Sequence, residues 1–304
     1  MGLIVPISIF GTDGFKALQQ IAIKGLSPLW VSSFANRPSQ LFDGAQKRLT
    51  ILTGKRLKAK TPTIFTSKYY RWTKEEFKHL FGGRVEYAPT HQNFTIFPNS
   101  LEKLGNSIEI SAFMRITCIR DRIANAVSAS ANGCIYYTRK FGYFLAFLNS
   151  VPRITEIKSG RRVPPSELKE LSFRSSSSVL IGIAALTSST FFWFWNVLSD
   201  CRNLNRRDLL AFTVNPEALP SYLKRDLLKL SVHYLNELKK ISRKMLKSGL
   251  RIETFEYSAC KPIIDQIDQV LAKHYGFTDE ELDFIINYDI KYRMGKGANS
   301  GEET

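Results

Sequence analysis

Residues 2–34 decide the fold of the N-terminal part, and they read GLIVPISIFGTDGFKALQQIAIKGLSPLWVSSF. The first nine of them are β-branched and apolar enough for a buried parallel strand. Phe15–Ile23 has the apolar spacing of a helix, and Pro28–Phe34 and Arg48–Gly54 again have the composition of strands. Strand and helix patterns that alternate in this way predict an α/β fold, although the stretch is too short for a whole doubly wound domain.

The middle of the chain mixes short elements of both kinds. A helix is expected over Thr73–Phe81 behind a threonine cap, and strands are expected at Ile108–Phe113 (IEISAF) and within Cys134–Leu148. This mixture predicts one irregular α+β domain over residues 61–215. The fold class expected for the chain is therefore α/β plus α+β, with residues 1–60 forming the edge of an α/β domain.

Residues 216–304 are expected to form a C-terminal helical region. The longest helix is predicted at Tyr222–Lys247, where apolar residues recur at three- and four-residue steps. A second helix is predicted at Pro262–Lys273, ended by Gly276, and a third begins at the capping box of Thr278 and Glu281.

Val179–Leu198 is a run of twenty residues without a charge, which is the length of a transmembrane helix. Four consecutive hydroxyl residues, Thr187–Thr190, lie near its middle, where a bilayer would hold only hydrocarbon. We therefore predict a small-residue helix followed by an aromatic segment, both buried in a protein core, and no membrane partner. A membrane-associated protein anchored through this run is the alternative.

The charge of the chain is strongly basic, with 43 Lys and Arg against 27 Asp and Glu, which gives +16. Residues 1–252 carry a net charge of +22, and residues 253–304 carry −6. A basic body of this kind predicts a polyanionic partner. An evenly solvated basic surface is the alternative.

The sequence lacks the motifs of several classes of protein. The four cysteines, Cys118, Cys134, Cys201 and Cys260, stand far apart, so neither a zinc site nor a disulfide framework is expected, and a cytoplasmic location fits best. The first residues lack the basic region and the cleavage site of a signal peptide. No His-Glu-x-x-His, Gly-x-Ser-x-Gly or Walker lysine loop occurs, which disfavours metallohydrolases and P-loop enzymes.

Cations stand next to aromatic residues at several places in the middle of the chain. Arg71 precedes Trp72, and Arg139 and Lys140 follow Tyr136 and Tyr137. Such mixtures suit phosphate contact and base stacking, which makes Arg71, Arg139 and Lys140 candidate DNA-binding residues.

Five segments resemble a known family. They are GLIVPISIFGTDGFKALQQ (2–20), FANRPSQLFDGAQKRLTILTG (34–54), FTSKYYRW (65–72), AALTSSTFFWFWNVLSDCRNLNRRDLLAF (184–212) and ACKPIIDQIDQVLAKHYGFTDEELDFIINYDIKYRMG (259–295). They are similar to the late catalytic motifs, target-recognition domain and C-terminal region of gamma-class N6-adenine DNA methyltransferases of restriction-modification systems. The resemblance extends over nearly the whole chain, and the last segment is the most specific.

The resemblance implies a function for each segment. Residues 1–60 would be the C-terminal remnant of a Rossmann-like catalytic domain, residues 61–215 would read double-stranded DNA, and the C-terminal helices would clamp DNA or a partner. A base that is methylated within a duplex must be extruded and needs an aromatic face to stack on. Phe42 matches the family residue with this role; the alternative is a hydrophobic plug at the entrance of a strand. Arg37, Lys47 and Arg48 flank Phe42 and are expected to hold phosphates, unless they are only solvated.

Two family motifs are absent from the sequence. They are the glycine-rich loop for S-adenosylmethionine and the Asn-Pro-Pro-Tyr or Asn-Pro-Pro-Phe tetrad; Asn215-Pro216 lies downstream and is followed by Glu217. We therefore expect no catalytic residue, no metal and no cofactor in this chain, with S-adenosylmethionine bound only by the complete enzyme. The expected partner is the N-terminal catalytic half or a methyltransferase subunit, and the chain is predicted to be inactive alone. A stand-alone DNA specificity subunit that serves a separate catalytic subunit is the alternative.

Overall fold

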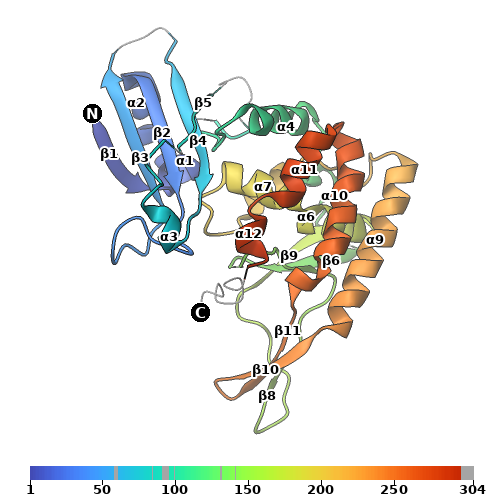
Figure 1. Ribbon diagram of the computed structural model, residues 1–304. Coiled ribbons are helices and arrows are strands. Elements are labelled where there is room, and N and C mark those ends of the chain that lie inside the picture. The colour runs from blue at the N-terminus through green and yellow to red at the C-terminus, as the bar shows by residue number, and fades with distance from the viewer. Residues whose placement is uncertain are drawn as a thin grey trace. The chain divides into compact units, whose positions relative to one another are not determined.

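The computed structural model describes residues 1–57, 61–83, 85–90, 96–98, 100–130, 132–140 and 142–295. The chain divides into two compact units (Figure 1). Unit 1 consists of Met1–Cys118 and Trp193–Asn203, and unit 2 consists of Ile119–Phe192 and Leu204–Thr304. Both contain helices and strands, so the mixed α and β class is confirmed. The functional boundaries near residues 60 and 215 stay predictions, since compactness does not test function.

Unit 1 is built on a five-stranded mixed sheet. In spatial order its strands are β1 (Gly2–Pro6), β3 (Leu49–Arg56), β2 (Leu26–Phe34), β4 (Ile64–Tyr70) and β5 (Ala88–Pro89). β3 is antiparallel to both β1 and β2, whereas β2 is parallel to β4. β1 and β2 therefore run in the same direction, and β3 is inserted between them.

Helical segments connect β1 to β2 and follow β4. They are α1 (Ser8–Gly11), η1 (Asp13–Phe15), α2 (Lys16–Gly25), α3 (Lys74–Phe77) and α4 (Ser107–Cys118). α2 confirms the helix predicted at Phe15–Ile23, and the threonine cap of α3 is the Thr73 capping box. At Gly11 an added Cβ would lie 2.7 Å from the backbone of Ser199, so only glycine permits this close approach.

Two sequence predictions for unit 1 are wrong. β1 is not a buried parallel strand but an edge strand, antiparallel to β3, with four of its five residues exposed. Residues 108–113 are not a strand, because they lie in α4. The Asn106 side chain accepts the Glu109 amide at 2.9 Å and starts this helix, and Ala112, Phe113 and Ile116 bury one helical face.

Unit 2 contains two three-stranded sheets and most of the helices. The first sheet has the order β7 (Phe147–Leu148), β6 (Gly133–Thr138), β9 (Leu168–Phe173), and the second has the order β10 (Arg243–Lys247), β11 (Leu250–Thr254), β8 (Ile154–Glu156). The helices are α5 (Ile123–Ala126), α6 (Ser176–Thr187), α8 (Arg206–Ala211), α9 (Ser221–Lys240), η3 (Tyr257–Cys260), α10 (Lys261–Tyr275), α11 (Asp279–Asn287) and α12 (Ile290–Arg293). α7 (Ser189–Leu198) begins in unit 2 and ends in unit 1.

The uncharged run at 179–198 is buried, as predicted, and its aromatic segment is a second helix. α6 and α7 meet at a bend of 66°, and both are almost entirely buried. Among the described residues no single helix is long and apolar enough to cross a membrane, and this bent pair meets the criterion only by length and composition.

Side chains from the C-terminal helices hold the bend between α6 and α7. The Asp268 carboxylate accepts the amides of Ser189 and Thr190 at 3.0 and 2.9 Å and the Thr190 hydroxyl at 2.7 Å. Arg293 donates to the Ser189 hydroxyl at 3.1 Å, and its guanidinium lies over the rings of Phe144 and Phe192. The first amides of α7 are thus satisfied by a buried carboxylate.

The helix predicted over Tyr222–Lys247 is too long. α9 ends at Lys240, and β10 and β11 then pair through a two-residue turn. Ser248 and Gly249 have φ values of 50° and 75°, which is the positive-φ geometry of a tight hairpin. By contrast, the two helices predicted after Pro262 are confirmed as α10 and α11, with Gly276 in the left-handed conformation at their junction.

Candidate nucleic-acid interface

The loop between β2 and β3, residues 35–48, carries four of the seven predicted DNA-contacting residues. Its base is closed by the Ala35 amide, which donates to the Tyr70 carbonyl at 2.8 Å. It is also closed by the Asn36 side chain, which donates to the Gln46 carbonyl at 3.1 Å. The second bond holds the two ends of the loop together, and the first attaches the start of the loop to the end of β4.

Leu41 and Phe42 are neighbours in sequence but have opposite environments. Leu41 is 4% exposed and packs with Phe34, Tyr70 and Trp72 in a core cluster, whereas Phe42 is 46% exposed. A turn follows in which the Ala45 amide donates to the Phe42 carbonyl at 3.0 Å. The hydrophobic plug considered for Phe42 is thus supplied by Leu41, and the Phe42 ring is presented to solvent.

Three cations belong to the same loop. Arg37 and Lys47 are exposed, and Arg48 is half-buried. Arg48 lies near Tyr69, where burial raises the pKa of that phenol to about 12 and the charges of Arg48 and Arg71 oppose the rise. Arg37 and Lys47 are thus placed for contact with an external anion, whereas Arg48 also interacts with the buried phenol of Tyr69.

Arg71 is held inside unit 1. Its guanidinium donates to the Asn196 side chain at 3.2 Å and lies 4.7 Å from the centroid of the Tyr69 ring. Its neighbour Trp72 is 2% exposed, so this aromatic is a core residue rather than a stacking platform. A DNA contact by Arg71 stays a prediction, and it competes with these internal contacts.

Arg139 and Lys140 belong to unit 2, the other compact unit. Both are exposed at the end of β6. Arg139 donates to the Asn205 side chain at 3.1 Å, and Lys140 pairs with Glu167 at 3.5 Å. Exposed pairs of this kind contribute little to stability and exchange readily for phosphate contacts.

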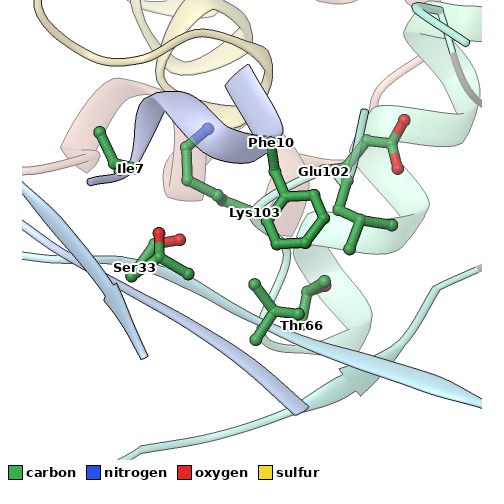
Figure 2. Close-up of a pocket in the computed structure, with 9 residues that line it drawn as sticks. Ile7, Phe10, Ser33, Thr66, Glu102 and Lys103 are labelled. Atoms are coloured by element: carbon green, nitrogen blue, oxygen red, sulfur yellow. The ribbon is translucent and has the colours of Figure 1, made fainter. Parts of the chain in front are cut away.

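A small cavity lies inside unit 1 between α1 and the sheet (Figure 2). Its volume is about 10 Å³, roughly the space that one water molecule needs. In Figure 2 the Phe10 ring from α1 points toward Thr66 of β4 across this space. The cavity is therefore too small for a nucleobase or a nucleotide cofactor.

Two consecutive residues at this cavity have opposite charges and different surroundings. Lys103 donates to the carbonyls of Val197 and Ser199 at 2.9 and 2.7 Å and so caps the C-terminal end of α7. Burial raises the pKa of Glu102 to about 7, and its Oε1 atom has no hydrogen-bond partner among the described residues. Glu102 is thus a buried carboxyl that titrates near neutrality.

Sequence reasoning missed the residues that shape the loop. Asn36 and Leu41 hold it to the body of unit 1. The signal for Leu41 was present, because Leu-Phe before a turn places adjacent side chains on opposite sides of the chain. The partner of Asn36 depends on loop closure, which the sequence pattern does not reveal.

The described residues contain no group of three or more His, Cys, Asp or Glu side chains placed to hold a metal ion. Comparison of the chain with protein-family models and with curated proteins finds no match. The loop combines an exposed aromatic ring, two exposed cations and a leucine anchored in the core.

Proposed function

We propose that this chain is the DNA-binding, sequence-recognition part of a site-specific N6-adenine DNA methyltransferase of a restriction-modification system. S-adenosylmethionine and the methyl-transfer chemistry would be supplied by a partner that carries the glycine-rich loop and the Asn-Pro-Pro tetrad. In this proposal the Phe42 ring stacks on the extruded adenine, and Arg37 and Lys47 contact the phosphates beside it.

One observation carries the proposal: the loop at 35–48 exposes Phe42 while Leu41 anchors it. An aromatic ring that only filled a core would not be 46% exposed beside a buried leucine. A rigidly presented ring has the shape that base stacking requires, because a flipped base needs a flat apolar face that is already in place. Cations on the same short loop supply the charge for the flanking phosphates.

The topology of unit 1 supports the Rossmann-like edge in this proposal. β1 and β2 run in the same direction and are connected through α1 and α2, with the antiparallel β3 between them. The sheet is therefore mixed, and it contains a strand-helix-strand crossover of the kind found in α/β domains.

Exposed apolar side chains on unit 1 support a protein partner at this edge. β1 has one neighbouring strand among the described residues, β3, and its Leu3 and Ile4 side chains are exposed. Phe15 at the end of η1 and Leu18 and Ile21 on α2 recur at three-residue spacing, and all three are exposed, Ile21 by 68%. Apolar surface of this kind beside an unpaired strand edge marks an interaction site.

Binding to a mismatched duplex tests the role of Phe42 without knowledge of the recognised sequence. A base in a mismatch costs less to extrude, so a base-flipping protein binds it more tightly. Base flipping, like methylation, is expected only with the N-terminal catalytic half. We therefore expect the chain in complex with this partner to prefer a duplex with one mismatched adenine over the fully paired duplex, and Phe42→Ala to remove about tenfold of this preference. Fluorescence anisotropy measures both affinities.

The matched control is Tyr222→Ala, which removes an aromatic ring that is 52% exposed on unit 2. This variant should keep the preference for the mismatch. Equal behaviour of the Phe42→Ala variant and the wild-type chain would contradict the stacking role. Methyl transfer by the purified chain alone would contradict the division of labour with a partner.

The partner surface has its own test. Ile21→Glu places a charge in the exposed apolar row of α2 and should abolish co-purification with a protein that carries the cofactor loop and the tetrad. Gln20→Glu, a change at an exposed position of the same helix outside this row, should leave co-purification intact. Loss of the partner with both variants, or with neither, would contradict the assignment of the row.

A further inference from the structure

A second feature of unit 2 suits nucleic acid and lies outside the loop at 35–48. It is the small sheet β10-β11-β8 together with its turns, residues 151–163 and 241–256, here named the basic arm. In Figure 1 it projects beyond the ends of α9 and α10. No residue of its three strands is buried, and all five residues of β10 are exposed.

Two turns form the tip of the basic arm and are joined to each other. The hairpin turn at Ser248 and Gly249 lies beside the loop that follows β8, because the Ile157 amide donates to the Gly249 carbonyl at 2.9 Å. The Gly160 amide closes that second loop by donating to the Glu156 carbonyl at 2.9 Å. The arm is therefore one hydrogen-bonded ribbon and not two separate loops.

The charge of the basic arm is unbalanced. Its two segments hold eight basic and three acidic side chains. Glu156 and Glu256 are paired, with Arg161 at 3.4 Å and Arg243 at 2.9 Å. Cations of the arm for which the described residues provide no ion pair are Arg153, Lys158, Arg162, Lys244, Lys247 and Arg251.

The unpaired cations lie on both faces of the ribbon. Residues directly opposite each other on paired strands share a face. Lys244 is opposite Glu253 and Leu246 is opposite Arg251, so one face carries Lys244 and Arg251 with the single carboxyl of Glu253. Lys247, opposite Leu250, lies on the other face. A ribbon that lay flat on one phosphate backbone would need charge on one face only. Charge on both faces suits a ribbon that has phosphates on both sides.

We propose that the β10–β11 hairpin of the basic arm enters the major groove of duplex DNA, where Lys244 and Arg251 contact the phosphates of one wall and Lys247 those of the other. The major groove admits a two-stranded β-ribbon, and its walls are lined by phosphates. Because no residue of the three strands is buried, neither face of the arm loses core packing when the arm enters a groove. The inference rests on the proposed DNA-binding function and adds a second, independent contact from unit 2.

The salt dependence of DNA binding tests the arm in the full chain. The slope of log affinity against log salt concentration falls by about 0.9 for each phosphate contact that is lost. The triple variant Lys244→Gln, Lys247→Gln and Arg251→Gln should reduce the magnitude of the slope by about 3 and the affinity for a random-sequence duplex by tenfold or more. The matched control neutralises two exposed lysines and one exposed arginine of unit 1, Lys24→Gln, Lys55→Gln and Arg56→Gln, and should change the slope by less than about 1.

Separating the two faces tests groove entry itself. The double variant Lys244→Gln and Arg251→Gln should lower the slope by about 2, and Lys247→Gln alone should lower it by about 1. An effect of one face only would overturn groove entry. Equal losses in the triple variant and the control would show a net-charge effect and overturn the arm as a site.

The outcomes also separate this inference from the proposed function. If the wild-type chain binds duplex DNA and shows the mismatch preference, but the triple variant keeps its full slope, only the basic arm fails. If the wild-type chain binds anionic vesicles or single-stranded RNA but not duplex DNA, both proposals fail. Unchanged circular dichroism spectra of the variants confirm that the neutral side chains preserve the fold.

Discussion

The bend between α6 and α7 and the basic arm are two regions of unit 2 that treat charge in opposite ways. At the bend, Arg293 is buried between the rings of Phe144 and Phe192 and donates to Ser189. In the arm, Lys247 is exposed and pairs with no acid among the described residues. Arg293 and Lys247 each add one positive charge to the chain, yet Arg293 stabilises the fold and Lys247 is available to a partner.

This difference shows why net charge is a weak guide to function. A buried ion has lost its hydration and can be retained only by hydrogen bonds and ring faces that replace water. An exposed cation keeps its hydration and its long-range field, which attracts a polyanion. Four comparisons of variants can break or sharpen this contrast, beginning with the largest expected effect.

Removal of the buried carboxylate at the bend should cost most. Asp268→Ala leaves two amides and one hydroxyl at the start of α7 without an acceptor. The expected loss is about 3–5 kcal/mol in the free energy of unfolding, measured by urea denaturation. The control is Asp283→Ala on α11, an exposed carboxyl bonded to Asn287, which should cost less than about 0.5 kcal/mol. Equal losses would contradict the role of the bend.

The buried Glu102 predicts a pH dependence in unit 1. Its folded-state pKa of about 7 lies above the ordinary value of 4.5, so between these pH values the folded state holds a proton that the unfolded state has lost. Stability should therefore be greatest below pH 4.5 and fall by about 3 kcal/mol as the pH rises to about 7.

Glu102→Gln isolates this contribution. The difference in unfolding free energy between wild type and variant should change by about 3 kcal/mol between pH 5 and pH 8, with the wild type relatively more stable at the lower pH. Glu109, whose pKa burial also raises to about 7, remains in both proteins and cancels from the difference. A difference that does not vary with pH would contradict the ionisation of Glu102 in this range.

The adjacent pair Leu41 and Phe42 repeats the contrast within one loop. Leu41→Ala removes a side chain that is 4% exposed and should cost about 2–3 kcal/mol of stability. Phe42→Ala should cost less than about 0.5 kcal/mol, because the ring is 46% exposed, while it removes the mismatch preference. Thermal unfolding and DNA anisotropy on both variants check the two effects. A larger loss of stability in Phe42→Ala than in Leu41→Ala would mean that Phe42, not Leu41, anchors the loop.

The basic arm should show the smallest effect on stability. The triple variant Lys244→Gln, Lys247→Gln and Arg251→Gln removes cations that lack ion pairs, so the free energy of unfolding should change by less than about 0.5 kcal/mol. Urea denaturation of the triple variant checks this. A larger loss would mean that these cations stabilise the fold, and the arm would then resemble the bend.

Prediction from sequence succeeded where local chemistry decides the structure. The Thr278 capping box, the glycine stop at Gly276 and the apolar spacing of α2 all depend on residues within a few positions of each other. The apolar run around Thr187 and Ser188 was likewise recognised as buried core that begins with a helix, since hydroxyls at its centre oppose a membrane span.

Prediction failed at two elements, one where a local cap was overlooked and one where a distant strand decides. Ile108–Phe113 has the composition of a strand, but the Asn106 cap and the buried face at Ala112 make it part of α4. The helix that starts at Ser221 was extended too far, because basic and apolar residues continue past Lys240 in a pattern that suits either structure. These residues form strands because β10 pairs with β11, and β11 pairs with β8. β8 lies more than ninety residues earlier in the chain, so this pairing leaves no local signal.

By itself, the sequence determined the mixed α and β class, the caps of the C-terminal helices, the buried apolar run and the excess of positive charge. These follow from residue type and short-range spacing, which act within one turn or one strand. The tertiary structure alone decided that Leu41 is the anchor and Phe42 the presented ring. It also decided that Arg293 is internal while Lys247 faces solvent. The physical reason is that burial depends on which distant segments pack together. A cation or an aromatic ring stabilises the fold when it is buried and is available to a partner when it is exposed.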